Sequence, residues 1–173
     1  MTSCRTARVL LLVPAAALVA GLTLGGCTAA PSDDVTRAPV AEWKKDAGAP
    51  EAAAFMKIQI PPGATEVKGA VRVQPQEYVY LLSFVTSEQS AEAITKDLHP
   101  DSPFAVAGPS SSSLSGDGFT HLGLVPPQEL ERVRTTSVCP PCVGDSSRRH
   151  IQGIEIHIAE VSNDRARVYL AAY

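Results

Sequence analysis

Hydrophobic and polar residues alternate along much of the chain with the two-residue period of β-strands. Residues 66–73 place valines on one face and charged side chains on the other, which predicts a half-buried strand. Residues 77–85 are apolar on both faces, as is typical of a central strand covered on both sides. Residues 55–60 and 119–125 are shorter apolar runs that also predict strands.

A helical pattern interrupts this alternation once. Thr86 and Gln89 have the spacing of a capping box, and apolar residues follow at helical intervals up to position 98. Residues 101–118 contain a run of four serines and predict a long surface loop. Residues 127–133 predict one or two further helical turns, with a proline at the first position.

The C-terminus predicts a β-hairpin from residues 151–161 and 166–172. One side of its sheet is apolar only if these residues share a face: Ile154, Ile156, Ile158, Val168, Leu170 and Ala172. That condition pairs Ile158 with Val168 and requires a three-residue turn at 162–164. The opposite face would then expose a polar surface to solvent or a partner, made by Glu155, His157, Arg167 and Tyr169.

The order of these elements predicts the fold class. Strands, then a helix, then strands favour a small α+β domain with a mainly antiparallel sheet, one helix packed on a face and a C-terminal β-hairpin. The chain of 173 residues has room for one such domain.

The N-terminus carries a different pattern. The apolar run of residues 9–24 is shorter than the ~20 residues that cross a bilayer, and it contains a proline. Arg5 and Arg8 precede this apolar run, and no acidic residue occurs before Cys27. These features are typical of a secretory signal peptide.

The tetrapeptide Leu24-Gly25-Gly26-Cys27 resembles the lipobox of bacterial lipoproteins. The resemblance implies a diacylglycerol thioether on Cys27, cleavage before it, and attachment to the extracytoplasmic face of the cell membrane. Two acyl chains are enough to hold a protein firmly on a bilayer. The alternative is an uncleaved signal anchor, and the resemblance extends to the N-terminus alone.

The chain therefore divides into a signal peptide (1–26), a lipidated cysteine with a flexible Ala/Pro-rich tether (27–54) and a single α+β domain (55–173). Trp43 falls in the tether. It either packs on the domain or lies in solvent, and a third alternative is an anchor at the headgroup level.

Charge and motifs narrow the function. The formal net charge is −3, and cleavage of the predicted signal peptide would remove two arginines and make the mature chain more acidic. The chain therefore lacks the basic excess of a nucleic-acid-binding protein, so nucleic acid is excluded as a partner. An acidic chain is also not attracted to anionic headgroups, so its contact with the membrane depends on the lipid. No hydrolase signature or phosphate-binding loop occurs. We expect no catalytic residue and no cofactor, and hence a non-enzymatic binding module for an envelope protein or a small ligand.

Cys139 and Cys142 are the cysteines left once Cys4 leaves with the signal peptide and Cys27 takes lipid. An extracytoplasmic location predicts that they form a structural disulfide. A redox centre, a metal pair and a reduced, idle pair are the alternatives. A thioredoxin-like centre needs a strand before the motif and a helix after it. Residues 135–137, before the motif, do not favour a strand, and residues 143–147, after it, do not favour a helix.

Other candidate residues have plainer interpretations. Cys139, Cys142, His150 and His157 form the one ligand-like cluster, but their spacing differs from that of a zinc finger, so no metal site is expected. His157 is interpreted as a polar-face histidine and residues 148–150 as a solvated basic turn. Tyr78, Tyr80 and Phe84 are interpreted as core residues, with a ligand platform or carrier site as the alternative.

Overall fold

A computed structural model describes residues 42–108, 117–139 and 141–173. The signal peptide, Cys27 and the first part of the tether lie outside these residues. Within the described part of the chain, no helix is both long and apolar enough to span a membrane.

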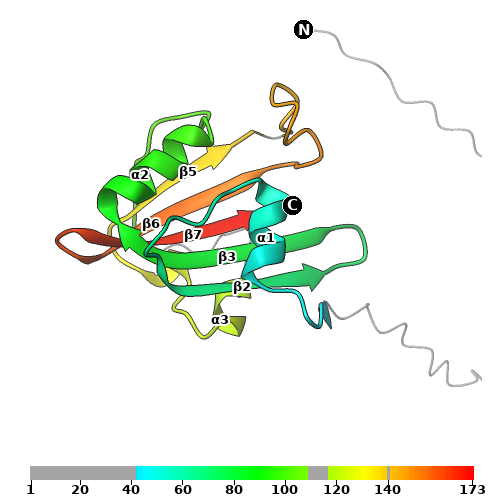
Figure 1. Cartoon of the computed structure of the whole chain (residues 1–173), viewed down its shortest axis with the longest axis horizontal. Helices are drawn as coiled ribbons and strands as arrows, with labels where there is room; N and C mark the ends of the chain where they lie inside the picture. Colours follow the sequence, from blue (N-terminus) through cyan, green and yellow to red (C-terminus); the bar gives the residue numbers. More distant parts are fainter. Residues whose placement is uncertain (1–41, 109–116, 140) are drawn as a thin grey trace, which may run out of the picture. The chain divides into compact units, whose positions relative to one another are not determined.

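Seven antiparallel strands form one sheet in the described residues, in the order β1-β2-β3-β7-β6-β5-β4 (Figure 1). The strands are β1 (Glu42–Trp43), β2 (Thr65–Val73), β3 (Tyr78–Ser87), β4 (Ala105–Ala107), β5 (Val133–Val138), β6 (Ile154–Ser162) and β7 (Arg165–Ala172). The helices are α1 (Ala49–Met56), α2 (Glu88–Asp97) and α3 (Gly118–His121), with a 3-10 helix η1 (Pro127–Glu129). The predicted α+β class and C-terminal hairpin are confirmed.

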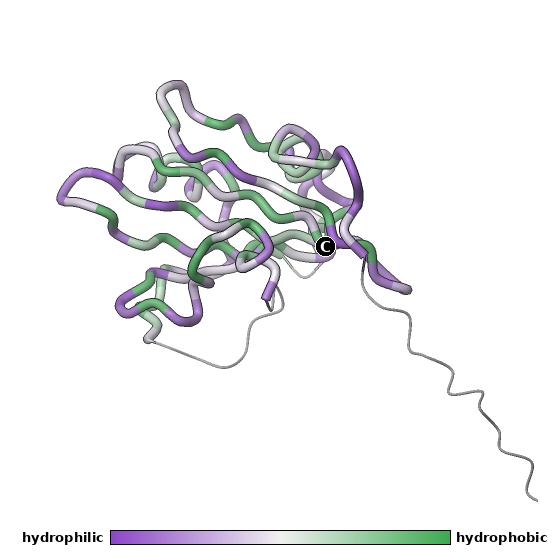
Figure 2. The backbone as a smooth tube through the Cα atoms, turned by 90° about the horizontal axis from the view of Figure 1, so that it is seen from below, coloured by the Kyte–Doolittle hydropathy of each residue, from purple (hydrophilic) through white to green (hydrophobic). Residues whose placement is uncertain are grey.

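One face of the sheet, here called the helix face, packs against α1 and α2 (Figure 1). Its core consists of buried aliphatic and aromatic side chains, among them Leu82, Phe84, Ile154, Ile156, Ile158, Val168 and Leu170. Most hydrophobic residues lie along the extended segments of the backbone, whereas most hydrophilic residues lie at its bends (Figure 2). The predicted apolar face of the hairpin is therefore correct, although two helices cover it instead of one.

The opposite face is covered by residues 117–133, here called the cover segment. Phe119, Leu122 and Leu130 of this segment pack with Leu81 and other residues of the sheet. The prediction of an open polar surface on this face is wrong for Tyr169, of which 3% is exposed. The other three predicted residues, Glu155, His157 and Arg167, are only partly exposed. The covering on both sides of β3 confirms its prediction as a central strand.

The hairpin register is as predicted, with Ile158 opposite Val168. The turn differs, because it consists of Asn163 and Asp164 alone. A shift of register between Glu160 and Ser162 accommodates the extra residue on the β6 side. A bulge of this kind adds one residue to a strand without changing which side chains share a face farther along.

The predicted tether is wrong for its last part, since residues 42–54 hold β1 and most of α1. The predicted strand at 55–60 is also wrong, because α1 continues to Met56. Alanine is the strongest helix former, and Pro50 occupies the first turn, where its missing N–H costs nothing. Gly69 allows the close approach of α1 to β2, because a Cβ there would lie 2.5 Å from the Ala49 Cα.

Trp43 packs on the domain, which confirms the first of its alternatives. Its ring stacks on His121 with centroids 3.8 Å apart, and the Arg72 guanidinium lies 6.0 Å from the ring centroid. The stack joins the edge strand β1 to α3.

Four local predictions need correction. The cap of α2 is Ser87, whose Oγ accepts from the Ser90 N–H at 3.1 Å, so the predicted cap is one residue early. Residues 119–125 form α3 and a turn instead of a strand. The predicted loop 101–118 contains β4. By contrast, the predicted helical turn that starts at Pro127 is confirmed by η1, and β5 begins at the last residue of the predicted region, Val133. In β2 the register shifts between Thr65 and Lys68, and Val67, predicted to be buried, is exposed.

Candidate functional site

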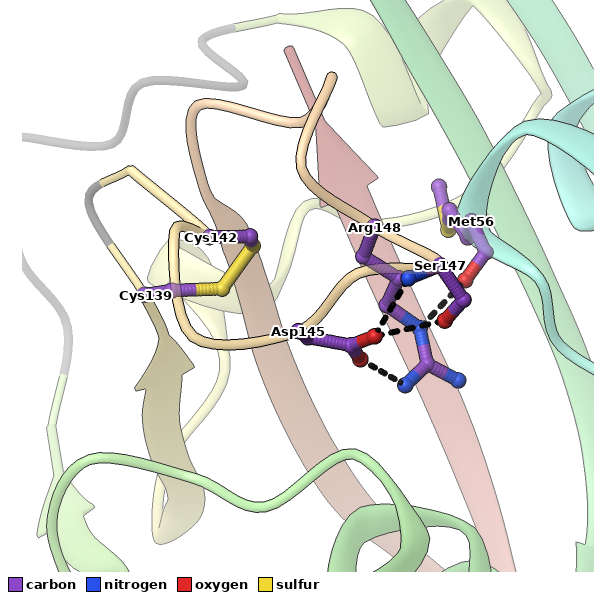
Figure 3. The surroundings of a disulfide bond; sticks show 6 residues. All are labelled: Met56, Cys139, Cys142, Asp145, Ser147 and Arg148. Carbon is purple, nitrogen blue, oxygen red and sulfur yellow. Dashed lines mark hydrogen bonds and ion pairs between the residues drawn. A yellow bond between two sulfur atoms is a disulfide. The ribbon is translucent and has the colours of Figure 1, made fainter.

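The cysteine pair lies where β5 leaves the sheet. Cys139 and Cys142 form a disulfide with their Cα atoms 4.6 Å apart (Figure 3). Cys142 is buried in the helix-face core, and its N–H donates to the Ile151 carbonyl at 3.1 Å. The disulfide therefore joins the end of β5 to the segment that leads into β6.

A network of hydrogen bonds orders the loop that follows the disulfide. The Asp145 carboxylate accepts from the Ser147 hydroxyl at 2.6 Å, the Ser147 N–H at 2.9 Å and Arg148 Nη1 at 2.8 Å (Figure 3). These bonds, led by that from the Ser147 hydroxyl, lower the pKa of Asp145 to about 2. Asp145 is thus ionised at neutral pH and fixes the turn as a hydrogen-bond acceptor.

Arg148 ties this loop to the end of α1. Its Nε donates to the Met56 carbonyl at 2.9 Å and its Nη2 to the Lys57 carbonyl at 3.1 Å (Figure 3 shows the first bond). The last carbonyls of a helix lack intrahelical partners and carry partial negative charge, so a guanidinium stabilises them. With 7% of its surface exposed, Arg148 is a buried anchor, and its prediction as part of a solvated turn is wrong.

A groove of about 850 Å³ lies beside the disulfide. The end of α2 and the residues after it form one wall, with Asp97, His99 and Asp101. The disulfide loop forms the other, from Val138 to Arg148. Both cysteines of the groove are in the disulfide, so neither is a free thiol.

Only one of the two elements of a thioredoxin-like centre is present. Because β5 runs to Val138, a strand does enter the motif, which corrects the expectation drawn from residues 135–137. No helix leaves it among the described residues 141–150, which form turns and bends. No helix dipole is therefore available there to stabilise a Cys139 thiolate.

The structure does not assemble the other candidates into a site. His150 contacts the Phe55 carbonyl at 3.3 Å, while His157 lies on the covered face of the sheet. Phe84 is buried and Tyr80 stacks on Phe55 at 3.7 Å, so these two aromatic residues form no open platform. Tyr78 is 52% exposed, so its interpretation as a core residue is wrong. Among the residues that the structure describes, no group of three or more His, Cys, Asp or Glu side chains is arranged to hold a metal ion.

Arg148 and the groove were missed by sequence reasoning, because the acceptors of Arg148 are backbone carbonyls about ninety residues away.

Comparison with models of protein families, with curated proteins and with solved structures found no match for the chain.

Proposed function

We propose that this protein is a non-enzymatic binding module of the bacterial cell envelope. Lipid on Cys27 holds it at the extracytoplasmic face of the membrane, and the groove beside the disulfide receives an envelope protein. The observation that carries the proposal is the bracing of this groove: a disulfide, the Asp145 turn and the Arg148 anchor fix one wall. Pre-organised walls lower the ordering cost of binding.

Support for the membrane anchor comes from the lipobox-like tetrapeptide and the short apolar run before it. Cys27→Ser removes the thiol that forms the thioether and should shift the protein out of the detergent phase or leave it uncleaved. Cys4→Ser is the matched control, because Cys4 lies in the predicted signal peptide. Equal detergent partitioning and equal processing of the two variants would refute lipidation.

Support for the binding role comes from the exposed rim of the groove. Val143 lines the groove and is 80% exposed, and Val161, in the hairpin, is 54% exposed and serves as the control position. A photo-crosslinking residue at each position of the full chain is to be activated in intact cells. We expect a discrete adduct from position 143, its loss when both Cys139 and Cys142 are serine, and no such adduct from position 161. The same adducts from both positions, or none, would contradict the proposal.

A second candidate function is thiol–disulfide exchange, favoured by the entry of β5 into the motif and by the position of Cys139 beside the groove. Insulin reduction and the reduction potential distinguish the two. A potential above about −230 mV together with turnover would favour the oxidoreductase, whereas structural disulfides usually lie below about −300 mV.

A further inference from the structure

A second cavity, of about 470 Å³, adjoins the groove beside the disulfide. It lies between residues 57–59, which follow α1, and residues 93–98 at the end of α2, and we call it the α1–α2 pocket. Asp97 and Leu98 line both the groove and this pocket. The two cavities therefore meet at the end of α2.

Arg148 braces the place where the cavities meet. Its Nη1 donates to the Asp145 carboxylate at 2.8 Å and its Nη2 to the Lys57 carbonyl at 3.1 Å, so it joins the disulfide loop to the end of α1. Leu98, which is buried in the helix-face core, fixes the end of α2. The walls of both cavities are thus held in place before a partner arrives, which lowers the ordering cost of binding.

The free charge in the groove is negative. Three of its described lining residues are carboxylates, Asp97, Asp101 and Asp145, against the single guanidinium of Arg148, with His99 as the remaining ionisable side chain. Arg148 and Asp145 neutralise each other. The carboxylates of Asp97 and Asp101 make no hydrogen bond to another residue that the structure describes, and Asp97 Oδ2 is 3.8 Å from Arg148 Nη2. The groove therefore suits a cationic side chain.

The position of Asp97 does not serve the helix. It is the last residue of α2, where the partial negative charge of the final carbonyls makes a carboxylate unfavourable. Its side chain is 79% exposed, so its ion pair with Arg148 contributes little to stability. A cation bound in the groove would offset both the charge of Asp97 and that of the helix end.

The α1–α2 pocket has a different character. Its apolar lining comes from Ile58, Ala93, Ile94 and Leu98, and its polar lining from Lys57, Gln59 and Asp97. Ile58 and Ile94 are partly buried and pack against the helix-face core. An aliphatic side chain that enters this pocket extends the core and removes apolar surface from water.

We propose that the groove and the α1–α2 pocket together receive one extended segment of a partner protein, with a lysine or arginine in the groove and an aliphatic residue two positions away in the pocket. The inference rests on the proposed binding role of the groove and specifies the chemistry of its partner. Asp97 and Ile94 are three residues apart on α2, so their Cβ atoms lie about 5–6 Å apart. Alternate residues of an extended chain point to the same side about 6.6 Å apart, whereas adjacent residues point to opposite sides.

The test is a peptide titration of the full chain in mild detergent with isotope-labelled isoleucine methyl groups. The chain has seven isoleucines, and the variants Ile94→Val and Ile58→Val assign the two signals of the α1–α2 pocket. The probe is the peptide acetyl-Ser-Leu-Ser-Lys-Ser-Leu-Ser-amide, which places a leucine two positions from the lysine in either chain direction. We expect both signals to shift and saturate with a half-point of about 1 mM, while those of Ile154 and Ile156 stay in place.

Two control peptides separate charge from spacing. In the first, glutamate replaces the lysine, and we expect binding at least about tenfold weaker. The second, acetyl-Ser-Ser-Leu-Lys-Leu-Ser-Ser-amide, has the same composition with the leucines adjacent to the lysine. It should bind at least about fivefold more weakly, because its lysine and leucines point to opposite sides of an extended chain.

Matched variants test each cavity. Asp97→Asn combined with Asp101→Asn should weaken binding of the lysine peptide about fivefold or more without lowering the melting temperature, whereas Asp46→Asn, at an exposed aspartate elsewhere, should leave binding unchanged. Ala93→Gln fills the α1–α2 pocket from an exposed position of α2 and should also weaken binding. Ala54→Gln, at an exposed position of α1 outside the pocket, is its control.

Three results would overturn the inference. The first is no shift of the Ile94 signal by the lysine peptide up to about 10 mM. The second is equal binding of the glutamate peptide or of the peptide with adjacent leucines. The third is a photo-crosslinked adduct from position 143 in cells that is unchanged by Asp97→Asn with Asp101→Asn. In each case a discrete adduct from position 143 would still support the binding role, so the inference and the proposed function can fail separately.

Discussion

The two faces of the sheet are built differently. The helix face is closed by aliphatic and aromatic side chains against α1 and α2, and the described part of the chain leaves no buried side-chain atom of the sheet unpaired there. On the covered face, Ser83 Oγ, His157 Nε2 and Arg167 Nη1 are buried without hydrogen-bond partners. The first face supplies stability through packing. The second face contains buried polar atoms without partners, which lowers the stability of the fold.

This comparison predicts that neighbouring substitutions in β6 have unequal effects. Ile156→Ala removes a fully buried side chain from the helix face and should cost about 2–5 kcal/mol of unfolding free energy. His157→Leu removes a buried nitrogen without a partner, so stability should stay unchanged or rise. Denaturant unfolding of the full chain measures both. Equal losses of unfolding free energy in the two variants would show that the two faces of the sheet contribute alike to stability.

Packing of α1 on the helix face is tested at Gly69. Gly69→Ala places a Cβ against the backbone of Ala49 and should cost about 1–3 kcal/mol, because the backbone must move. Gly144→Ala is the control, since a Cβ there meets nothing within 4 Å. Thermal unfolding should fall for the first variant and barely change for the second. A wild-type melting temperature for Gly69→Ala would mean that α1 is not held against β2.

The attachment of the cover segment to the sheet is tested at Lys68. Lys68→Met removes the hydrogen bond to the Leu122 carbonyl and should cost about 1 kcal/mol. Amide hydrogen exchange should rise in residues 119–125 and stay constant in α2. Lys96→Met, an exposed change on α2, should leave the cover segment protected. Unchanged exchange at 119–125 in Lys68→Met would show that apolar packing alone holds the cover.

Acid should affect the helix face through the Asp145 turn. The folded-state pKa of Asp145 is about 2, below its ordinary value of 3.8, so its stabilising contribution is complete above that ordinary value. The contribution is lost as the pH falls from about 4 towards 2. Unfolding curves across this range should converge for wild type and Asp145→Asn. A constant difference between them would show that the carboxylate contributes nothing through its charge.

Local patterns were sufficient for part of the fold. The central strand β3 and the hairpin of β6 and β7 follow from side-chain alternation, and the isoleucines of β6 determine its register. β5 was missed because its middle residues are Thr and Ser, and its Arg134 is exposed enough to pair with Glu88 and Glu92 of α2. α1 was missed because its stability depends on Gly69, a remote residue.

Some features of the candidate sites could likewise be predicted from local patterns, and others could not. The pairing of Cys139 with Cys142 follows from counting cysteines, and the structure contains it. The position of His157 opposite the isoleucines also follows from alternation. What covers that face depends on tertiary contacts of a segment without periodicity, so the covering could not be inferred from the sequence.

The placement of β1 has a mechanical consequence. β1 is a two-residue strand at the edge of the sheet, paired with β2 through Glu42 and Trp43, and it is the first element of the described chain. A pulling force on the N-terminal side reaches these two residue pairs and the Trp43–His121 stack before it reaches α1. Such an edge peels one pair at a time. Under tension from the N-terminal side, β1 is therefore expected to detach before α1 and before the central strands β3, β7 and β6.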